Sequence, residues 1–439
     1  MKYDIDKLKN NGVFCILPWM SAYVNTDSTV WSCCVNKAMT DGDIRAKMKE
    51  ENSDWVADKS IISNDLENII NDNHFKQLRL DMLNGVENQN CFDCINLEKN
   101  TGHSYRKDFN RDFADELYRV QETQEDGTIK DFDVIYLDFR FSNVCNFKCR
   151  SCRPEWSSTW AKEARDNDRH PYTEWDGYIP RYDLTQDEFI SKFEGSLSKV
   201  KKIYFAGGEP LAAKEHYWIL DYLIKNNNTN VLIDYNTNLS MLKNNKLKLS
   251  VVDYWEKFEN ISLRVSIDGM GDKAEYIRKG TDWKLIEDNF KYVRQRLPNV
   301  NIGISSVFQL FNAIHLADFY QDWIDKKIIN ERTIENIFVI PLTGPLQLSS
   351  QVLPKEVKDL VVKRWDEFEI KNKKLLEKTN LYPNGGFINY LNTCIQHMKS
   401  EELYETHKRE FEKFTWYLDK IRRESFSDIF PELKKYYEC

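Results

Sequence analysis

The sequence has no run of apolar residues that approaches the length of a membrane-spanning helix, so we expect no transmembrane segment and no membrane partner. Its first residues, Met1 to Asp6, contain no basic stretch that leads into an apolar one, which argues against a secretory signal. No repeat of fixed period and no low-complexity tract stands out. These absences predict a soluble, cytoplasmic protein in a reducing compartment.

Clustered positive charge is also missing. The chain has 62 Lys and Arg against 70 Asp and Glu, spread along its whole length, for a net charge of −8. Binding to a phosphate backbone depends on grouped basic residues, so nucleic acid is not an expected partner. With 439 residues, of which 41% are apolar and 13% aromatic, the chain can form two or three domains or one large domain with additions.

Ten cysteines are present, and in a reducing compartment grouped cysteines indicate metal ligands rather than disulfides. Cys145, Cys149 and Cys152 have the spacing CxxxCxxC and follow a β-type run over 134–141. Three thiolates in one loop can hold three corners of a cubane iron–sulfur cluster and leave the fourth iron open for chemistry. The alternative is that they are three of four ligands to a structural zinc ion.

A second motif, Gly207-Gly208-Glu209-Pro210, ends the predicted strand over 202–206. Glycines at a strand end let the backbone approach a ligand, and a neighbouring carboxylate can accept a hydrogen bond from an ammonium group. The alternative is an ordinary turn in which Glu-Pro opens a helix.

The N-terminal third contains a second set of cysteines. Turn residues over 25–28 separate two β-type runs and predict a hairpin, with Cys15 before it and Cys33 or Cys34 at its end. A helix is predicted over 64–84 with Gly85 as its stop, followed by Cys91 and Cys94. Cys15, Cys33, Cys91 and Cys94 would make a closed coordination sphere for an iron–sulfur cluster or for zinc.

From residue 133, β-type runs alternate with helical stretches, which predicts an α/β fold with a parallel sheet. Short polar residues, among them Asn238, Ser266 and Asp268, lie at or just past the ends of predicted strands, at the edge where parallel sheets bind ligands. Segment 100–130 is interpreted as a linker, 166–182 as an inserted loop, and the chain after Leu346 as mostly helical. The six predicted strands cover 134–141, 202–206, 231–235, 261–269, 300–307 and 336–340.

The CxxxCxxC loop, followed one βα unit later by GGEP, resembles the radical S-adenosylmethionine (SAM) enzymes. The N-terminal cysteines resemble the auxiliary-cluster module called twitch, a shortened relative of the SPASM domain. The resemblance extends over about residues 14–343. It implies a twitch-like auxiliary module at 1–125, a radical SAM partial (β/α)6 barrel at 130–345, and a helical C-terminal segment at 346–439.

The resemblance also implies roles for single residues. The open iron at Cys145, Cys149 and Cys152 would chelate SAM, and Gly207, Gly208, Glu209 and Pro210 would hold its methionine amino group. Ser266 and Asp268 would lie near the ribose, Asn238 on the substrate side, and Arg278 near the SAM carboxylate. The chain departs from the family at Ser151, where an aromatic residue often packs on the adenine, and at Ser28, where the hairpin has a glycine.

By this resemblance the cofactors are one SAM-binding [4Fe-4S] cluster, a second auxiliary [4Fe-4S] cluster and SAM itself. The expected reaction is reductive cleavage of SAM to a 5′-deoxyadenosyl radical, which abstracts hydrogen from a peptide or protein substrate. Flavodoxin or ferredoxin would supply the electron. Two alternatives remain: dehydrogenation of a small alcohol such as a sugar or aminocyclitol, and a zinc-stabilised binding protein without redox chemistry.

Overall fold

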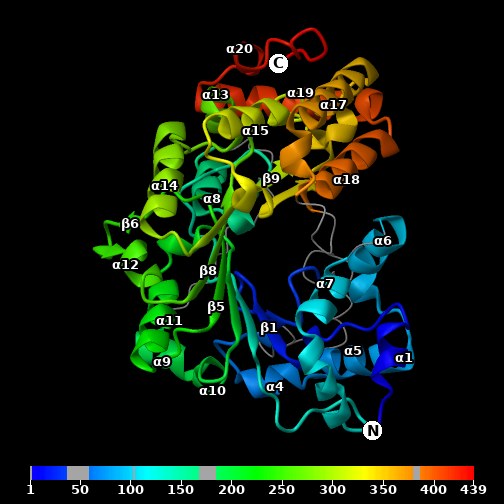
Figure 1. Ribbon diagram of the computed structural model, residues 1–439, viewed down its shortest axis with the longest axis vertical. Helices are drawn as coiled ribbons and strands as arrows, with labels where there is room; N and C mark the ends of the chain where they lie inside the picture. The colour runs from blue at the N-terminus through cyan, green and yellow to red at the C-terminus, as the bar shows by residue number, and fades with distance from the viewer. Residues whose placement is uncertain (1, 37–58, 102–103, 168–183, 379–385) are drawn as a thin grey trace. The chain divides into compact units, whose positions relative to one another are not determined.

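The computed structural model describes residues 2–36, 59–101, 104–167, 184–378 and 386–439 (Figure 1). The chain forms two compact units, and each is described by itself. The first unit comprises Met1–Asn143, Ile179–Ile233 and Lys257–Glu259, and the second comprises Val144–Tyr178, Asp234–Glu256 and Asn260–Cys439.

The sheet of the first unit begins with the predicted hairpin, which is confirmed: β1 (Ser21–Val24) pairs antiparallel with β2 (Val30–Trp31). Ser28 in its turn has φ +67°, a left-handed conformation that glycine adopts without strain. The sequence did not predict that β1 also pairs in parallel with β3 (Tyr136–Phe139), which in turn pairs in parallel with β4 (Lys202–Phe205). The hairpin therefore extends the parallel sheet by one strand.

The predicted helix over 64–84 is two helices, α4 (Leu66–Ile70) and α5 (Asn73–Asn84). Asp72 starts the second one, because its side chain accepts a hydrogen bond from the backbone N–H of Phe75 at 2.8 Å. Gly85 ends it with φ +73°, as predicted. The first unit also contains α1 (Ile5–Lys9), α6 (Phe92–Thr101), α7 (Tyr105–Asp112) and the 3-10 helix η4 (Ala114–Glu122).

The segment interpreted as a linker, 100–130, is instead part of the core of the first unit. Phe113, Leu117 and Val120 are buried and pack in one cluster with Trp19 and Tyr136. Their spacing of four and three residues is typical of one helical face, so the sequence contained this signal beneath its polar composition. Burial of these side chains joins residues 104–129 to the hairpin region.

Aromatic residues fix the two faces of β3. Phe139 on one face packs against Phe193 and Phe205, which lie on the side of α9 (Gln186–Ser191), α10 (Glu194–Leu197) and α11 (Lys214–Lys225). Thr185 starts α9 with a capping box, because its side chain accepts from the N–H of Glu188 and the Glu188 side chain accepts from the N–H of Thr185. Because side chains alternate along a strand, Tyr136, Asp138 and Arg140 project from the opposite face.

The second unit contains β8 (Asn260–Ser266), β9 (Asn301–Phe308) and β10 (Ile337–Pro341), paired in parallel in that order. β5 (Leu232–Thr237) begins in the first unit and ends in the second. All six predicted strands are present, and the predicted α/β class with a mostly parallel sheet is confirmed. The helices that alternate with these strands are α8 (Ser158–Arg165), α12 (Val251–Trp255), α13 (Gly271–Ile277), α14 (Trp283–Arg296), α15 (Leu316–Asp325) and α16 (Glu331–Ile334).

The C-terminal part of the second unit is helical, as predicted, and forms the orange and red end of the chain in Figure 1. No helix within the described ranges is long and apolar enough to cross a membrane. The inserted loop predicted over 166–182 lies almost entirely outside the described residues. The C-terminal helices are α17 (Lys355–Leu376), α18 (Gly386–Ser400), α19 (Tyr404–Arg422) and α20 (Phe426–Ile429).

Candidate functional site

The loop that carries Cys145, Cys149 and Cys152 is held by backbone hydrogen bonds within the second unit. The N–H of Lys148 donates to the carbonyl of Lys279, and the N–H of Arg150 donates to that of Ile277, each at 2.8 Å. All three cysteines are in the thiol form and partly exposed. Residues 277–279, at the end of α13 and just after it, thus hold the cysteine loop in place.

Gly280, the next residue, lets this backbone segment lie close to the cysteine loop. It has φ +111°, and a Cβ there would lie 2.9 Å from both the carbonyl oxygen of Asn146 and the ring of Phe147. We expect Gly280→Ala to lower the free energy of unfolding by about 1–3 kcal/mol, because strain and overlap add. Thermal unfolding of the metal-free protein measures this. Gly195→Ala is the control, since nothing lies within 4 Å of that Cβ; equal stability of both variants would contradict the prediction.

Arg278 links Cys149 to a buried carboxylate. Its Nη1 approaches the Cys149 Sγ at 3.9 Å, and its Nε lies 2.8 Å from Oδ2 of Asp268. Burial raises the pKa of the Cys149 thiol above its ordinary value, while the neighbouring Arg278 charge acts in the opposite direction. Three residues that the sequence singled out separately, at 149, 268 and 278, are therefore in contact.

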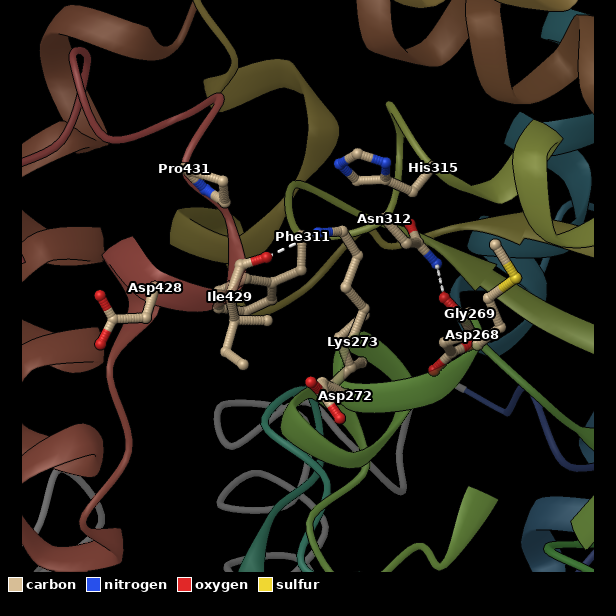
Figure 2. A pocket seen from close by; sticks show the side chains of 12 residues that line it. Asp268, Gly269, Asp272, Lys273, Phe311, Asn312, His315, Asp428, Ile429 and Pro431 are labelled. Atoms are coloured by element: carbon tan, nitrogen blue, oxygen red, sulfur yellow. Dashed lines mark hydrogen bonds between the residues drawn. The ribbon is translucent and has the colours of Figure 1, made fainter. Parts of the chain in front are cut away.

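Asp268 is fixed on its other side as well. Its Oδ1 accepts the N–H of Val307 at 2.8 Å, and its carbonyl accepts Nδ2 of Asn312 at 3.0 Å. A cavity of about 420 Å³ adjoins it, between α13 and α20 (Figure 2). Lys273 lines this cavity and donates to the carbonyl of Ile429 at 2.6 Å. Ser266, half-buried at the end of β8, is paired in register with Ser305.

Asn238 follows β5 and contacts the cysteine loop directly. Its Nδ2 donates to Oδ1 of Asn146 at 3.0 Å, and its own Oδ1 accepts from the N–H and hydroxyl of Ser240 at 2.9 and 2.7 Å. The side chain is thus held by the loop between Cys145 and Cys149. It lies at the carboxyl edge of the sheet, where the sequence predicted it.

The GGEP motif lies in the first unit. Gly207 has φ +102°, and a Cβ there would lie 3.1 Å from the Cα of Arg140, so glycine permits close approach of the two backbones. Glu209 is buried, and its Oε1 accepts the N–H of Leu211 at 3.2 Å. Pro210 opens the short helix η6 (Pro210–Ala212), so the motif also makes the helix-opening turn considered above.

The four N-terminal cysteines of the predicted second set line one cavity in the first unit. Cys34 lines it too, as does Arg106, whose backbone N–H lies 3.4 Å from the Sγ of Cys94. Within the described ranges, no group of three or more His, Cys, Asp or Glu is arranged to hold a single metal ion. The cavity brings together Cys15, Cys33, Cys91 and Cys94 from segments that are far apart in the chain.

The donor sets at both places fit iron–sulfur chemistry, in which cysteine thiolates are the usual ligands. Burial raises the pKa of Cys91 and that of Cys152 to about 12, so both thiols are protonated in the metal-free protein. Metal binding must displace these protons.

The sequence did not predict a row of polar side chains on the sheet of the first unit, which we call the polar row. Tyr23 and Tyr204 flank Asp138 in register on β1 and β4, and Arg140 lies 3.0 Å from the Asp138 carboxylate with its guanidinium 4.8 Å from the Tyr204 ring. Burial raises the pKa of Asp138 to about 6, although Arg140 opposes this. The alternation of polar and apolar residues over 136–141 was the available signal.

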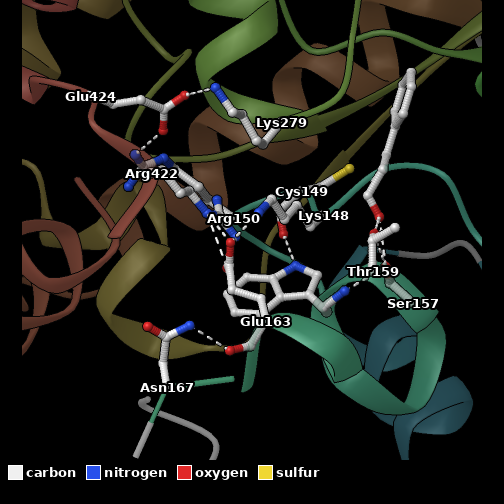
Figure 3. A network of polar contacts seen from close by, with 12 residues as sticks. Lys148, Cys149, Arg150, Ser157, Thr159, Glu163, Asn167, Lys279, Arg422 and Glu424 are labelled. Carbon is white, nitrogen blue, oxygen red and sulfur yellow. Dashed lines mark hydrogen bonds and ion pairs between the residues drawn. The ribbon is translucent and has the colours of Figure 1, made fainter. Parts of the chain in front are cut away.

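The sequence also did not predict that charged residues of the cysteine loop form ion pairs with distant helices. Lys148 forms an ion pair with Glu163 of α8 (Figure 3), and Arg150 forms one with Asp419 of α19. Arg150 and its partner Asp419 are 269 positions apart, so no local pattern could have paired them.

The family model described as "Radical SAM superfamily" matches residues 139–312, less than half of the chain. The match includes the CxxxCxxC loop, GGEP and the residues at 238, 266, 268 and 278. It includes neither the N-terminal cysteines nor the C-terminal helices. A search of curated proteins returned no match.

The chain is similar to several solved structures. "Native anSMEcpe with bound AdoMet" is 19% identical, with 54% of this chain and 61% of that one covered and a TM-score of 0.38. Streptococcus suis SuiB bound to S-adenosylmethionine is 13% identical, with 64% and 58% covered and a TM-score of 0.39. This chain thus spans about three fifths of the length of each.

Proposed function

We propose that this protein is a radical SAM enzyme that reductively cleaves SAM and abstracts hydrogen from a peptide or protein substrate, assisted by an auxiliary iron–sulfur cluster. One observation carries the proposal. Cys149, in a three-cysteine loop, lies beside Arg278, which pairs with the buried Asp268, and all of these residues fall within the part that matches the radical SAM model.

Cys145, Cys149 and Cys152 would hold the SAM-binding [4Fe-4S] cluster. When bound, this cluster supplies the electron that converts SAM to methionine and a 5′-deoxyadenosyl radical, the species that abstracts hydrogen. The chain's own residues orient SAM. Arg278, fixed by Asp268, would pair with its carboxylate, and Glu209 would accept from its amino group, with Gly207, Gly208 and Pro210 shaping the backbone there. Ser266 and Asp268 would lie near the ribose, and Asn238 on the substrate side.

Cys15, Cys33, Cys91 and Cys94 would ligate the auxiliary cluster in a twitch-like module over 1–125, followed by the radical SAM core at 130–345. Electrostatics favours Cys33 over Cys34. Burial is the main cause that raises the pKa of both thiols. The charges that act on Cys33 beyond this are those of Cys34, Cys91 and Cys15, whereas Asp138 and Arg140 act on Cys34. Cys34 would then border the polar row instead of the cluster.

The substrate is proposed to be a peptide or protein, with a small alcohol as the second possibility. Either oxidation removes one hydrogen atom, one proton and one electron. Asp138, whose pKa burial raises to about 6 against the effect of Arg140, would be the candidate acceptor of the proton. The auxiliary cluster would accept the electron, and flavodoxin or ferredoxin would reduce the SAM-binding cluster at the start of each cycle.

Anaerobic purification tests the cofactor assignment. We expect a brown protein with roughly eight irons and matching sulfide, because two cubane clusters are proposed. After reduction with dithionite in the presence of SAM, 5′-deoxyadenosine and methionine should form in equal amounts. A colourless protein that keeps zinc during chelation and does not cleave SAM would establish the zinc-stabilised alternative instead.

The substrate class can be tested by hydrogen transfer. The reduced enzyme is incubated with SAM and with either a deuterated peptide library or deuterated polyols. Deuterium in 5′-deoxyadenosine from the peptides, and not from the polyols, supports the proposal. The opposite result would make the protein a small-alcohol dehydrogenase.

A further inference from the structure

The cysteine loop carries a fully buried arginine, Arg150, directly after Cys149. Its Nη2 lies 2.5 Å from Oδ1 of Asp419 on α19 and 2.8 Å from the carboxylate of Glu424 just beyond that helix. Its guanidinium also stacks on the Tyr276 ring, 3.6 Å from the centroid. The Tyr276 hydroxyl donates to the same Asp419 oxygen at 2.7 Å, which closes the arrangement.

In a second ion pair, the arginine lies on α19 and the carboxylate lies on α8, the helix after the cysteine loop. Arg422 has no exposed side-chain surface, and its Nη2 and Nε lie 2.8 and 3.1 Å from Oε1 of Glu163 on α8. The Arg422 guanidinium lies 4.7 Å from the Trp160 ring, and the indole N–H of Trp160 donates to the carbonyl of Cys149 at 2.6 Å. This chain of contacts therefore ends at a proposed cluster ligand.

Figure 3 shows the two guanidinium groups between the carboxylates of Glu163 and Glu424. Two lysines complete the network: Lys148 pairs with Glu163, and Lys279 lies 2.8 Å from Glu424. Four cations thus face three carboxylates, those of Asp419, Glu424 and Glu163. Nη1 of both arginines is buried without a hydrogen-bond partner among the described residues. The network leaves a net positive charge beside the cysteine loop.

Stability alone is a poor reason for such a network. Removing a charged group from water costs several kcal/mol, and replacing buried ion pairs by well-packed apolar residues is often neutral or stabilising. Charges that lie next to a redox centre have a further effect, because the reduction potential of an iron–sulfur cluster depends on nearby charge, hydrogen bonds and solvent exposure. A reduced cluster carries one more negative charge than an oxidised one.

We propose that α19 is part of the SAM-cluster site: through Arg150, Arg422 and their carboxylate partners it holds the cysteine loop and sets the reduction potential of the cluster there. These are positioning residues and touch neither SAM nor substrate. The inference deepens the proposed function and depends on it for the cluster. It gives the C-terminal helical segment at 346–439 a role in electron transfer.

The sign of the potential shift tests the electrostatic part. Arg150→Met removes a positive charge and should make the cluster harder to reduce, whereas Glu424→Gln removes a negative charge beside Arg150 and Lys279 and should make it easier to reduce. For each variant we expect about a tenfold change in the ratio of reduced to oxidised cluster at a fixed potential, which is ~59 mV for one electron. A redox titration of the anaerobic holoenzyme, followed by electron paramagnetic resonance, measures both shifts.

Lys420→Met is the matched control, because Lys420 is exposed on the same helix and the substitution removes the same charge. It should leave the potential unchanged. Opposite shifts in the two buried variants with none in the control support the proposal. No shift, or shifts of the same sign, would overturn its electrostatic part, because a merely structural role loosens the loop in both variants alike.

The positioning part is tested without any cluster. In the metal-free protein, hydrogen exchange over residues 144–153 should become at least tenfold faster in Glu163→Gln and in Arg150→Met, and stay unchanged in Lys420→Met. Unchanged exchange in both buried variants would overturn it. If the wild-type protein bound no iron, the proposed function would fail, and the exchange experiment would still decide whether α19 holds the loop.

Discussion

Replacing Cys149 by alanine is expected to abolish SAM cleavage and to lower the iron content from roughly eight to roughly four atoms per chain. Two remaining thiolates cannot hold three corners of a cubane, so the cluster with the open iron is lost while the auxiliary one stays. Burial raises the pKa of the Cys149 thiol, so the metal-free protein holds it neutral and the substitution removes only a small side chain. Iron analysis and 5′-deoxyadenosine formation after dithionite reduction measure the effect.

Cys394→Ala is the matched control for this experiment. Cys394 is completely buried in α18, where its thiol donates to the carbonyl of Val339 at 3.6 Å, and it belongs to neither proposed cluster. This variant should keep all its iron and its SAM cleavage, at a stability cost of about 1 kcal/mol. If Cys149→Ala cleaved SAM as fast as the wild type, the loop could not be the SAM-binding site.

The fold was largely predictable because its signals are local. Every predicted strand of the sheet is an apolar or alternating run that ends at a turn, and Gly85 ends α5 as predicted. The predictions were wrong where a few residues decided the structure against the overall pattern of the segment. Asp72 caps a new helix inside the predicted one, and three buried side chains join residues 104–129 to the core despite the polar sequence around them.

The site was predictable only in part, for the same reason. Motifs with a fixed spacing, such as CxxxCxxC and GGEP, are visible in a single sequence. The pairing of Arg278 with Asp268 is not, because it depends on the turn that reverses the chain after α13. The ion pairs of Arg150 and Arg422 depend on a helix more than 250 positions away along the chain, and no local pattern reports that. Residue 151 is a serine, so it cannot pack on the adenine as the aromatic residue often found at this position in radical SAM enzymes does.

Replacing Cys91 by alanine should remove the auxiliary cluster and leave the SAM-binding cluster in place, the reverse of the result expected for Cys149→Ala. Iron should again fall from roughly eight to roughly four, but reduced enzyme should still cleave SAM, because Cys145, Cys149 and Cys152 are untouched. With substrate present, 5′-deoxyadenosine would form without oxidised product, since the auxiliary cluster, the proposed acceptor of the electron, is missing. Iron analysis, 5′-deoxyadenosine and product are measured on the same sample.

Cys34→Ala is the sharpest control for Cys91→Ala, because Cys34 lines the same cavity but interacts mainly with Asp138 and Arg140. It should keep roughly eight irons. Loss of four irons in Cys34→Ala, with none lost in Cys33→Ala, would exchange the ligand assignment of these neighbours. Full turnover by Cys91→Ala would contradict a catalytic role for the auxiliary cluster, since its electron would then have another acceptor. The outcome at residue 91 therefore decides whether the N-terminal cysteines take part in the chemistry or only stabilise the fold.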